Sequence, residues 1–364
     1  MYDVFGVRAD TSISDPAYRA ARGEADDGSM AWARRRRDEL CAELPSVGVT
    51  AFCPALRGVH DAGAYSRLRS TFRPRTAERA ASILGVHLDG PLRAPVHDEA
   101  TPRGEPHLAG TIERARGQLA EGEIDRIYGG EVSAAEGVAL VTIAPELPGA
   151  LDAVRLLRSR GVVVGIGRTE ATLAECAKAV AAGATFVAHL FNHMPSFHHR
   201  DPGPVGLLGA DSGAADGAEG VDGDGVGGGD AAGRVSYTLA VGAKMMHDST
   251  IRLAQLTHPR GLIVASDVPQ RAGSGKGEEG VSALDACVRH VWRSTGYADP
   301  SAALLAASAH PAALLGLRNK GSLAPGADAD LVLLDGELQV LGCYVGGLLA
   351  WEHPKMHGAY WWHR

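Results

Sequence analysis

The sequence lacks several patterns that would each define a class of protein. Its five cysteines lie far apart and form no C-x-x-C pair, which indicates reduced thiols and a cytoplasmic protein rather than a disulfide framework. No apolar stretch is long enough to span a membrane, and the opening residues contain no signal-peptide core. No G-x-G-x-x-G turn follows an apolar run, so a dinucleotide-binding fold has little support.

Charge of one sign is also scarce. The net charge is −7 over 364 residues, and the only dense basic run is Arg34 to Arg37. That run follows an acidic patch, so we interpret it as a solvated helix face and expect no nucleic-acid partner. The one biased segment, Gly209–Gly233, consists almost entirely of Gly, Ala and Asp. Its acidic residues are irregularly spaced, which favours a disordered loop over a calcium site.

The remaining chain alternates between apolar runs and amphipathic segments. The runs "VALVTI", "VVVGIG", "TFVAHLF" and "LIVAS" are buried-strand patterns, and helical stripes follow the first two, as in Leu173, Cys176, Ala177 and Val180. A later stripe comprises Leu284, Cys287, Val288, Val291 and Trp292. Strands of this kind, each followed by a helix, predict an α/β fold with a parallel sheet, as in a TIM-type (β/α)8 barrel. An open doubly wound sheet is the alternative.

Polar residues follow the predicted strands at their carboxyl ends, where barrel active sites lie. They are His87, Asp89, Glu146, Arg168, His189, Asn192 and Asp267. Any one of them could be structural, because an Asp after a strand is often a helix N-cap. Together they suggest a site in which Glu146 and His189 bind a divalent metal. Asp267 is suitably placed to be a base for a metal-bound water.

Longer pieces of the chain resemble the N-acetylglucosamine-6-phosphate deacetylase family of the amidohydrolase superfamily. They include "LGVHLDGP", "VTIAPE", "GATFVAHLFNHMPSFHHRDPGPVGLLG", "HPRGLIVASD" and "KGSLAPGADADLVLLD". The resemblance extends from about Val47 to Val345. It implies hydrolysis of the acetamide of N-acetylglucosamine 6-phosphate in the cytoplasm, one divalent ion (zinc in the first place), and a homodimer.

The resemblance also implies a role for each matching residue. Glu146 and His189 would bind the metal, and Asp267 would be the catalytic acid and base. Asn192 and His193 would contact the substrate. Arg200 would bind the sugar phosphate, a task for which the guanidinium fork is suited. His198 and His199, which complete a cluster of four histidines in this stretch, would shape the turn that presents Arg200.

Four departures from the family pattern qualify this prediction. Arg168 stands where the family has its third metal ligand, a His. Lys244 or Met245 replaces a substrate-binding His, and the segment after Asp267 is shortened. We expect the first barrel strand to be missing, which leaves an incomplete barrel over residues 1–318, the carboxyl-terminal strands of a small β-sandwich over 319–352, and a tail over 353–364. The alternative to a working deacetylase is therefore a non-catalytic or incomplete homologue.

Overall fold

The computed structural model describes residues 2–3, 8–10, 28–57, 62–94, 122–209, 234–241, 246–266, 283–296 and 299–356. Several positions singled out above lie outside these ranges, namely 210–233, Lys244, Met245, Asp267, the shortened segment after it up to residue 282, and the tail beyond residue 356. In the described part of the chain, no helix is both long and apolar enough to cross a membrane.

An eight-stranded sheet forms the centre of the molecule. Its order is β11-β10-β9-β8-β7-β6-β4-β2, and every neighbouring pair is parallel, as a curled α/β sheet with crossover connections requires. In the described residues no pairing joins the edge strands β2 and β11. The strands are β2 (Arg8–Asp10), β4 (Ala55–Arg57), β6 (Val86–Asp89), β7 (Val138–Ile143), β8 (Val163–Ile166), β9 (Phe186–Val187), β10 (Ser236–Ala240) and β11 (Leu262–Ala265).

The strand that we expected to be missing has a counterpart at one edge of this sheet. β2 pairs in parallel with β4, and β1 (Tyr2–Asp3) pairs in parallel with β3 (Ala51–Phe52). β1 and β3 belong to a second parallel sheet in the order β1-β3-β5, in which β5 is Ser82–Ile83. Along the chain, β1, β3 and β5 are followed by β2, β4 and β6 of the large sheet, respectively. The absence of a first strand is therefore not confirmed. The pairs are only two or three residues long, too short for an apolar run to reveal them in the sequence.

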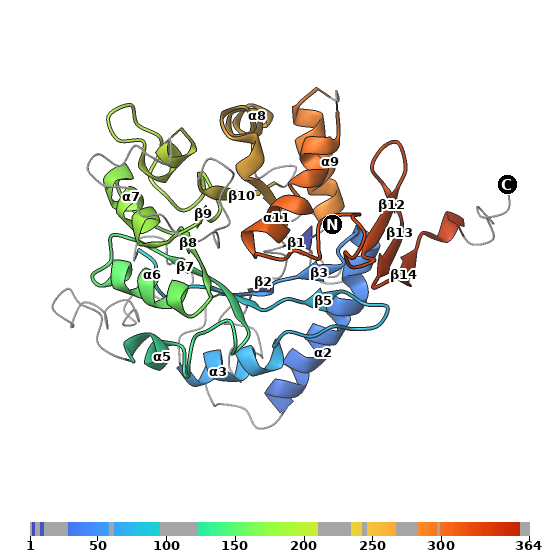
Figure 1. The fold of residues 1–364 in the computed structure, drawn as a ribbon, viewed down its shortest axis with the longest axis horizontal. Coiled ribbons are helices and arrows are strands. Elements are labelled where there is room, and N and C mark those ends of the chain that lie inside the picture. The colour runs from blue at the N-terminus through green and yellow to red at the C-terminus, as the bar shows by residue number, and fades with distance from the viewer. Residues whose placement is uncertain are drawn as a thin grey trace.

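Helices surround the sheet on its outer side (Figure 1). The stripe predicted for α9 is confirmed, since four of its five residues are buried and Trp292 is partly buried. In α7, Cys176 of the predicted stripe is buried and Leu173 and Val180 pack partly buried against the core, while Ala179, outside the stripe, is buried as well. The helices are α2 (Gly28–Glu43), α3 (Ala62–Thr71), α5 (Glu123–Ile127), α6 (Ala150–Ser159), α7 (Leu173–Ala182), α8 (Asp248–Thr257), α9 (Leu284–Ser294), α10 (Ser301–Leu305) and α11 (Ala309–Leu314).

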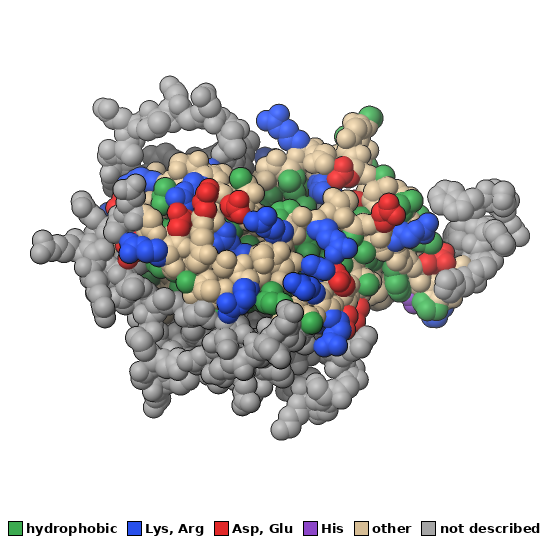
Figure 2. Space-filling model, turned by 90° about the horizontal axis from the view of Figure 1, so that it is seen from below, with side chains coloured by type: hydrophobic (Ala, Val, Ile, Leu, Met, Phe, Trp, Pro, Cys, Tyr) green, Lys and Arg blue, Asp and Glu red, His purple; other side chains and the backbone are tan. Residues whose placement is uncertain are grey.

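The basic run on α2 lies on a solvated helix face, as predicted, because Arg34 and Arg35 are exposed and Arg36 and Arg37 are half-buried. Arg36 contacts Glu39 and Glu43, and Arg37 contacts Asp38. In the view from below, basic and acidic side chains are interspersed over the described part of this face (Figure 2).

The carboxyl-terminal strands form a small antiparallel sheet in the order β12-β13-β14. They are β12 (Leu331–Leu334), β13 (Val340–Val345) and β14 (Leu348–Glu352), and the last two contact the short 3-10 helix η1 (Leu44–Val47). Exposed and half-buried residues alternate along β12, the pattern of a strand with one solvated face. That these strands belong to a β-sandwich stays a prediction.

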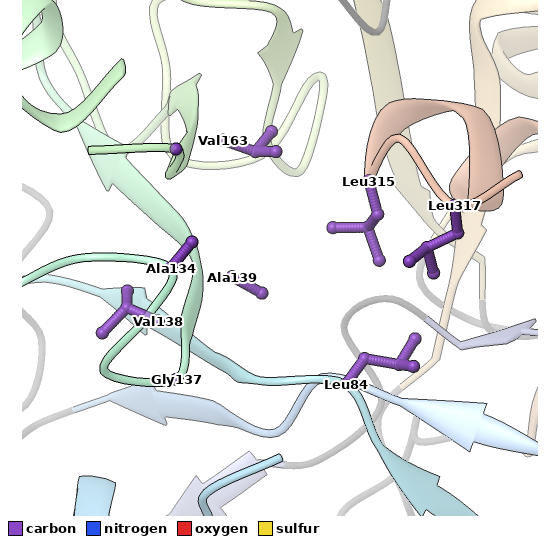
Figure 3. Close-up of a pocket in the computed structure, with 9 residues that line it drawn as sticks. Leu84, Ala134, Gly137, Val138, Ala139, Val163, Leu315 and Leu317 are labelled. Atoms are coloured by element: carbon purple, nitrogen blue, oxygen red, sulfur yellow. The ribbon is translucent and has the colours of Figure 1, made fainter. Parts of the chain in front are cut away.

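The amino-terminal end of the parallel sheet holds an apolar pocket of about 130 Å³ (Figure 3). Its walls come from the segments that begin β6, β7 and β8 and from Leu315 and Leu317 after α11. Aliphatic side chains and glycines make up the whole lining. The pocket therefore carries no group that could perform acid–base or metal chemistry.

Candidate active site

The opposite, carboxyl ends of the same strands bring four charged or titratable residues into neighbouring positions. Asp89 is the last residue of β6, and Glu146 follows β7. Arg168 and His189 follow β8 and β9. Because these strands are adjacent and parallel, their ends face one edge of the sheet, where α/β proteins bind ligands.

Asp89 is the centre of the most buried cluster at this edge. Its side chain is 0% exposed, and its Oδ2 atom lies 3.3 Å from Nε of Arg168, which is 6% exposed. The same oxygen lies 3.5 Å from Nε2 of His189. A buried carboxylate is stable only with a counter-charge and hydrogen bonds. The Arg168 guanidinium supplies both.

The backbone around this cluster adopts an unusual conformation. Arg168, His189, Phe191 and His193 have φ angles of 51°, 50°, 73° and 55°, in the left-handed region that costs non-glycine residues roughly 1–2 kcal/mol each. Only Arg79 and Leu338 share this feature elsewhere among the described residues. Such strain is typical of functional sites, where packing must hold it in place.

Hydrogen bonds from neighbouring strands fix these strained turns. The backbone N–H of His189 donates to Oγ1 of the buried Thr238, 2.8 Å away on β10. The Ala94 N–H donates to the Arg168 carbonyl at 2.8 Å, and the Ala144 N–H donates to the Leu92 carbonyl at 2.8 Å. The loop after Asp89 is thereby tied to the ends of both β7 and β8. The Asp89–Arg168 pair therefore has a rigid frame.

Glu146 lies beside this cluster and is already hydrogen-bonded. Its Oε2 accepts from the Thr169 hydroxyl, and its Oε1 accepts from the Glu170 N–H at 2.7 Å. Thr169 is fully buried and adjoins Arg168. These bonds hold the carboxylate against the segment that carries Arg168.

The predicted substrate residues divide into two groups. Asn192 and His193 are joined to the cluster, because the Asn192 N–H donates to the His189 carbonyl and the Thr169 N–H donates to the His193 carbonyl. Arg200 is exposed on a separate turn, where its N–H donates to Nδ1 of His198 at 3.3 Å. That bond agrees with the predicted role of His198 in shaping the turn. Among the described residues, no hydrogen bond or ion pair links the Arg200 side chain to the cluster.

The turn that carries Arg200 is attached to the start of α7. Oδ1 of Asp201 accepts the N–H groups of Leu173 and Gly203 at 2.9 and 3.0 Å. These two backbone bonds lower the pKa of Asp201 below its ordinary value. The carboxylate stays charged at neutral pH and keeps the turn in place.

Sequence reasoning did not assign a role to three residues that build this site. Asp89 was noted only as a polar residue at a strand end, while Thr169 and Thr238 carried no signal at all. Thr169 contacts Glu146, and Thr238 holds the His189 backbone. The position of Asp89 after an apolar run was the one usable clue. Ser266 ends the described part of the β11 segment, so Asp267 lies just beyond it.

The described donors do not fit the three-ligand metal site that the resemblance implies. Arg168 takes the position of the third ligand, and a guanidinium offers no lone pair. Within the described ranges, no three His, Cys, Asp or Glu side chains are grouped so that they could hold an ion. Oδ2 of Asp89 is already the anion to which Arg168 is paired. The positive charge at this position therefore comes from the Arg168 guanidinium.

Comparison with known proteins gives this arrangement a family. The Amidohydrolase family model matches residues 249–354. The N-acetylglucosamine-6-phosphate deacetylase of Bos taurus is 36% identical over 340 residues, which cover 86% of this chain and 76% of that protein. The N-acetylgalactosamine-6-phosphate deacetylase of Escherichia coli O157:H7 is 31% identical over 294 residues, with 74% and 69% covered.

Solved structures agree with the sequence comparison. The crystal structure of N-acetyl-D-glucosamine-6-phosphate deacetylase from Mycobacterium smegmatis superposes with a TM-score of 0.62 at 25% identity, covering 96% of this chain and 85% of that one. The parallel sheet and the match to the Amidohydrolase family model define the chain as a member of the amidohydrolase class. Within that class, the chain belongs to the N-acetylglucosamine-6-phosphate deacetylase family.

Proposed function

We propose that the chain hydrolyses the acetamide of N-acetylglucosamine 6-phosphate to glucosamine 6-phosphate and acetate. The observation that carries this proposal is the 36% identity over most of the chain to a deacetylase of that name. The cluster of Asp89, Arg168 and His189 at the carboxyl edge of the sheet supports it. Barrel enzymes place their catalytic groups at this edge.

Four residues have a proposed task in this reaction. Asn192 and His193 hold the sugar beside the cluster, and Arg200 binds the phosphate through its guanidinium fork. Water adds to the acetamide carbonyl carbon while Asp267 accepts the water's proton. Asp267 then delivers a proton to the nitrogen as the C–N bond breaks, so that acetate and the free amine leave.

The family resemblance implies a divalent ion at this site. Its predicted ligands, Glu146 and His189, offer the oxygen and imidazole donors that zinc accepts. Oxygen atoms of Glu146 are hydrogen-bonded to Thr169 and Glu170, and Arg168 occupies the third position. Zinc bound by Glu146 and His189 stays a prediction that the described geometry does not fit.

An acetate-release assay tests the proposal directly. Purified chain is incubated with N-acetylglucosamine 6-phosphate, its galactosamine epimer and unphosphorylated N-acetylglucosamine, because an epimer-specific deacetylase is among the relatives. We expect turnover of the glucosamine phosphate, loss of turnover in Asp267→Asn, and a raised KM in Arg200→Ala. No acetate from any substrate would favour a non-catalytic homologue. Equal rates with and without the phosphate would remove Arg200 from the proposal.

We also propose a cytoplasmic homodimer with a barrel domain over residues 1–318 and the small sheet over 319–352. None of the five cysteines forms a disulfide and all five are buried, which suits a reducing compartment. The outer strands of the small sheet expose Leu331, Leu333 and Leu348, and exposed sheet edges favour pairing with another chain. Light scattering on the purified chain should give twice the monomer mass; a monomer would contradict the dimer.

A further inference from the structure

The buried carboxylate of Asp89 needs a counter-charge. This carboxylate is fully buried on β6, and a buried anion must be neutralised by a nearby cation or lose its charge. In a site that holds a divalent ion, the ion can neutralise the surrounding carboxylates. Here a side chain of the protein lies against Asp89 at 3.3 Å.

We propose that the Arg168 guanidinium, held by Asp89, is a built-in cation that takes the place of the divalent ion at this site. The inference rests on the proposed function only in treating this edge as the reaction site. Arg168 satisfies the charge of Asp89 permanently, because an arginine is not deprotonated in proteins. The same Asp89 oxygen also lies 3.5 Å from His189, the strongest remaining ligand candidate.

A divalent ion would have to displace this pair. It would approach a fixed positive charge in a poorly solvated site, where repulsion between like charges is only weakly screened. It would also compete with Arg168 for Asp89 and with Thr169 and Glu170 for Glu146. Each competition lowers the affinity of the site for metal.

Arg168 cannot easily move aside to admit an ion. Its side chain is 6% exposed, and its backbone carbonyl is bonded to the Ala94 N–H. Its φ of 51° is held by the surrounding turns rather than by its own preference.

Cobalt(II) and zinc titrations test the proposal without any need for activity. The parent, Arg168→His and the matched control Arg155→His, which changes an exposed arginine of α6, are first stripped with EDTA. In the parent and in Arg155→His, we expect no visible cobalt absorption band that is lost when His189 is also changed to Ala. Arg168→His should bind cobalt at least ~10-fold more tightly, and zinc should raise its Tm. Zinc and EDTA should leave the Tm of the parent unchanged.

Further variants separate this inference from folding failure and from the proposed function. If Arg168→His does not fold, the zinc content of the parent still tests the proposal. Metal that remains in His189→Ala is bound at another place. About one zinc per parent chain that is lost in His189→Ala would overturn the proposal, as would a folded Arg168→His with the parent's affinity. Absence of acetate release under all conditions would count against the proposed function alone. Deacetylation by metal-free parent would support both.

Discussion

The two ends of the central strands carry different kinds of side chain, apolar at one end and charged at the other. At the amino-terminal end, Leu84, Val138, Val163 and Leu315 line a pocket without a polar side chain. At the carboxyl end of β6 and β8, the same sheet buries a carboxylate and a guanidinium, and the residue that carries the guanidinium has a left-handed backbone. The strands thus give stability at one end and position reactive groups at the other, a division typical of barrel enzymes.

The largest expected effect comes from removing the buried cation. Arg168→Met leaves Asp89 buried without its counter-charge, and breaking such a pair costs about 3–5 kcal/mol. The exposed pair Arg155–Asp152, with a similar 2.8 Å contact and side chains 60% and 49% exposed, is the control. Arg155→Met should cost less than about 1 kcal/mol. Urea unfolding of both variants measures the difference, and equal losses would show that burial of the Asp89 pair has no special weight.

A change at the apolar end should affect stability but not the reaction. Leu315→Ala enlarges a pocket that already exists, which should lower the free energy of unfolding by about 2 kcal/mol. Because the pocket adjoins the starts of the strands, KM and kcat for acetate release should stay at the parent values. A tenfold fall in kcat at unchanged folding would mean that the two ends are coupled.

A smaller effect is expected at Glu146. Thr169→Val keeps the buried shape but removes the hydroxyl that donates to this carboxylate, at a cost of about 1–2 kcal/mol. Ligand binding should weaken as well, since Glu146 loses one of the bonds that hold it beside Arg168. Calorimetry with glucosamine 6-phosphate measures both stability and affinity. Affinity equal to that of the parent would place Glu146 outside the site.

The sequence predicted a strand only where its apolar run was long enough. The apolar runs of β7, β8 and β11 were long enough to be identified as strands, whereas β9 is only Phe186–Val187 because the chain turns at Ala188. β1 and β2 gave no signal because a few residues cannot display a period.

The site was predicted in its residue types but not in its pairing. Strand-end positions and the family resemblance singled out Glu146, His189 and the departure at Arg168. The pairing of Arg168 with Asp89 joins residues 79 positions apart. It depends on the loop 90–94 and on two left-handed turns, which no local pattern specifies. Burial of charge was therefore the part that only the fold could show.

The smallest expected effect is on the pH dependence of stability, and it comes from the buried cysteines. Burial raises the pKa of Cys41 to about 11 and of Cys176 and Cys343 to about 12, from an ordinary value near 9.0. The unfolded chain therefore releases these protons first as pH rises, and stability should begin to fall above about pH 9. Urea midpoints between pH 7 and 11 measure the slope. A matched Cys41→Ala, Cys176→Ala, Cys343→Ala variant should show less of it, and a parent midpoint that stays constant to pH 11 would contradict the expectation.

Hydrogen exchange with and without glucosamine 6-phosphate tests the contrast between the two ends most directly. The account predicts that the ligand slows exchange in peptides covering 87–94, 167–170 and 189–193, at the carboxyl ends of the strands. Peptides covering 134–139 and 314–317, beside the apolar pocket, should exchange at the same rate in both samples. Slowed exchange at the apolar pocket with none around Asp89 and Arg168 would contradict the assignment of the carboxyl end as the reaction site.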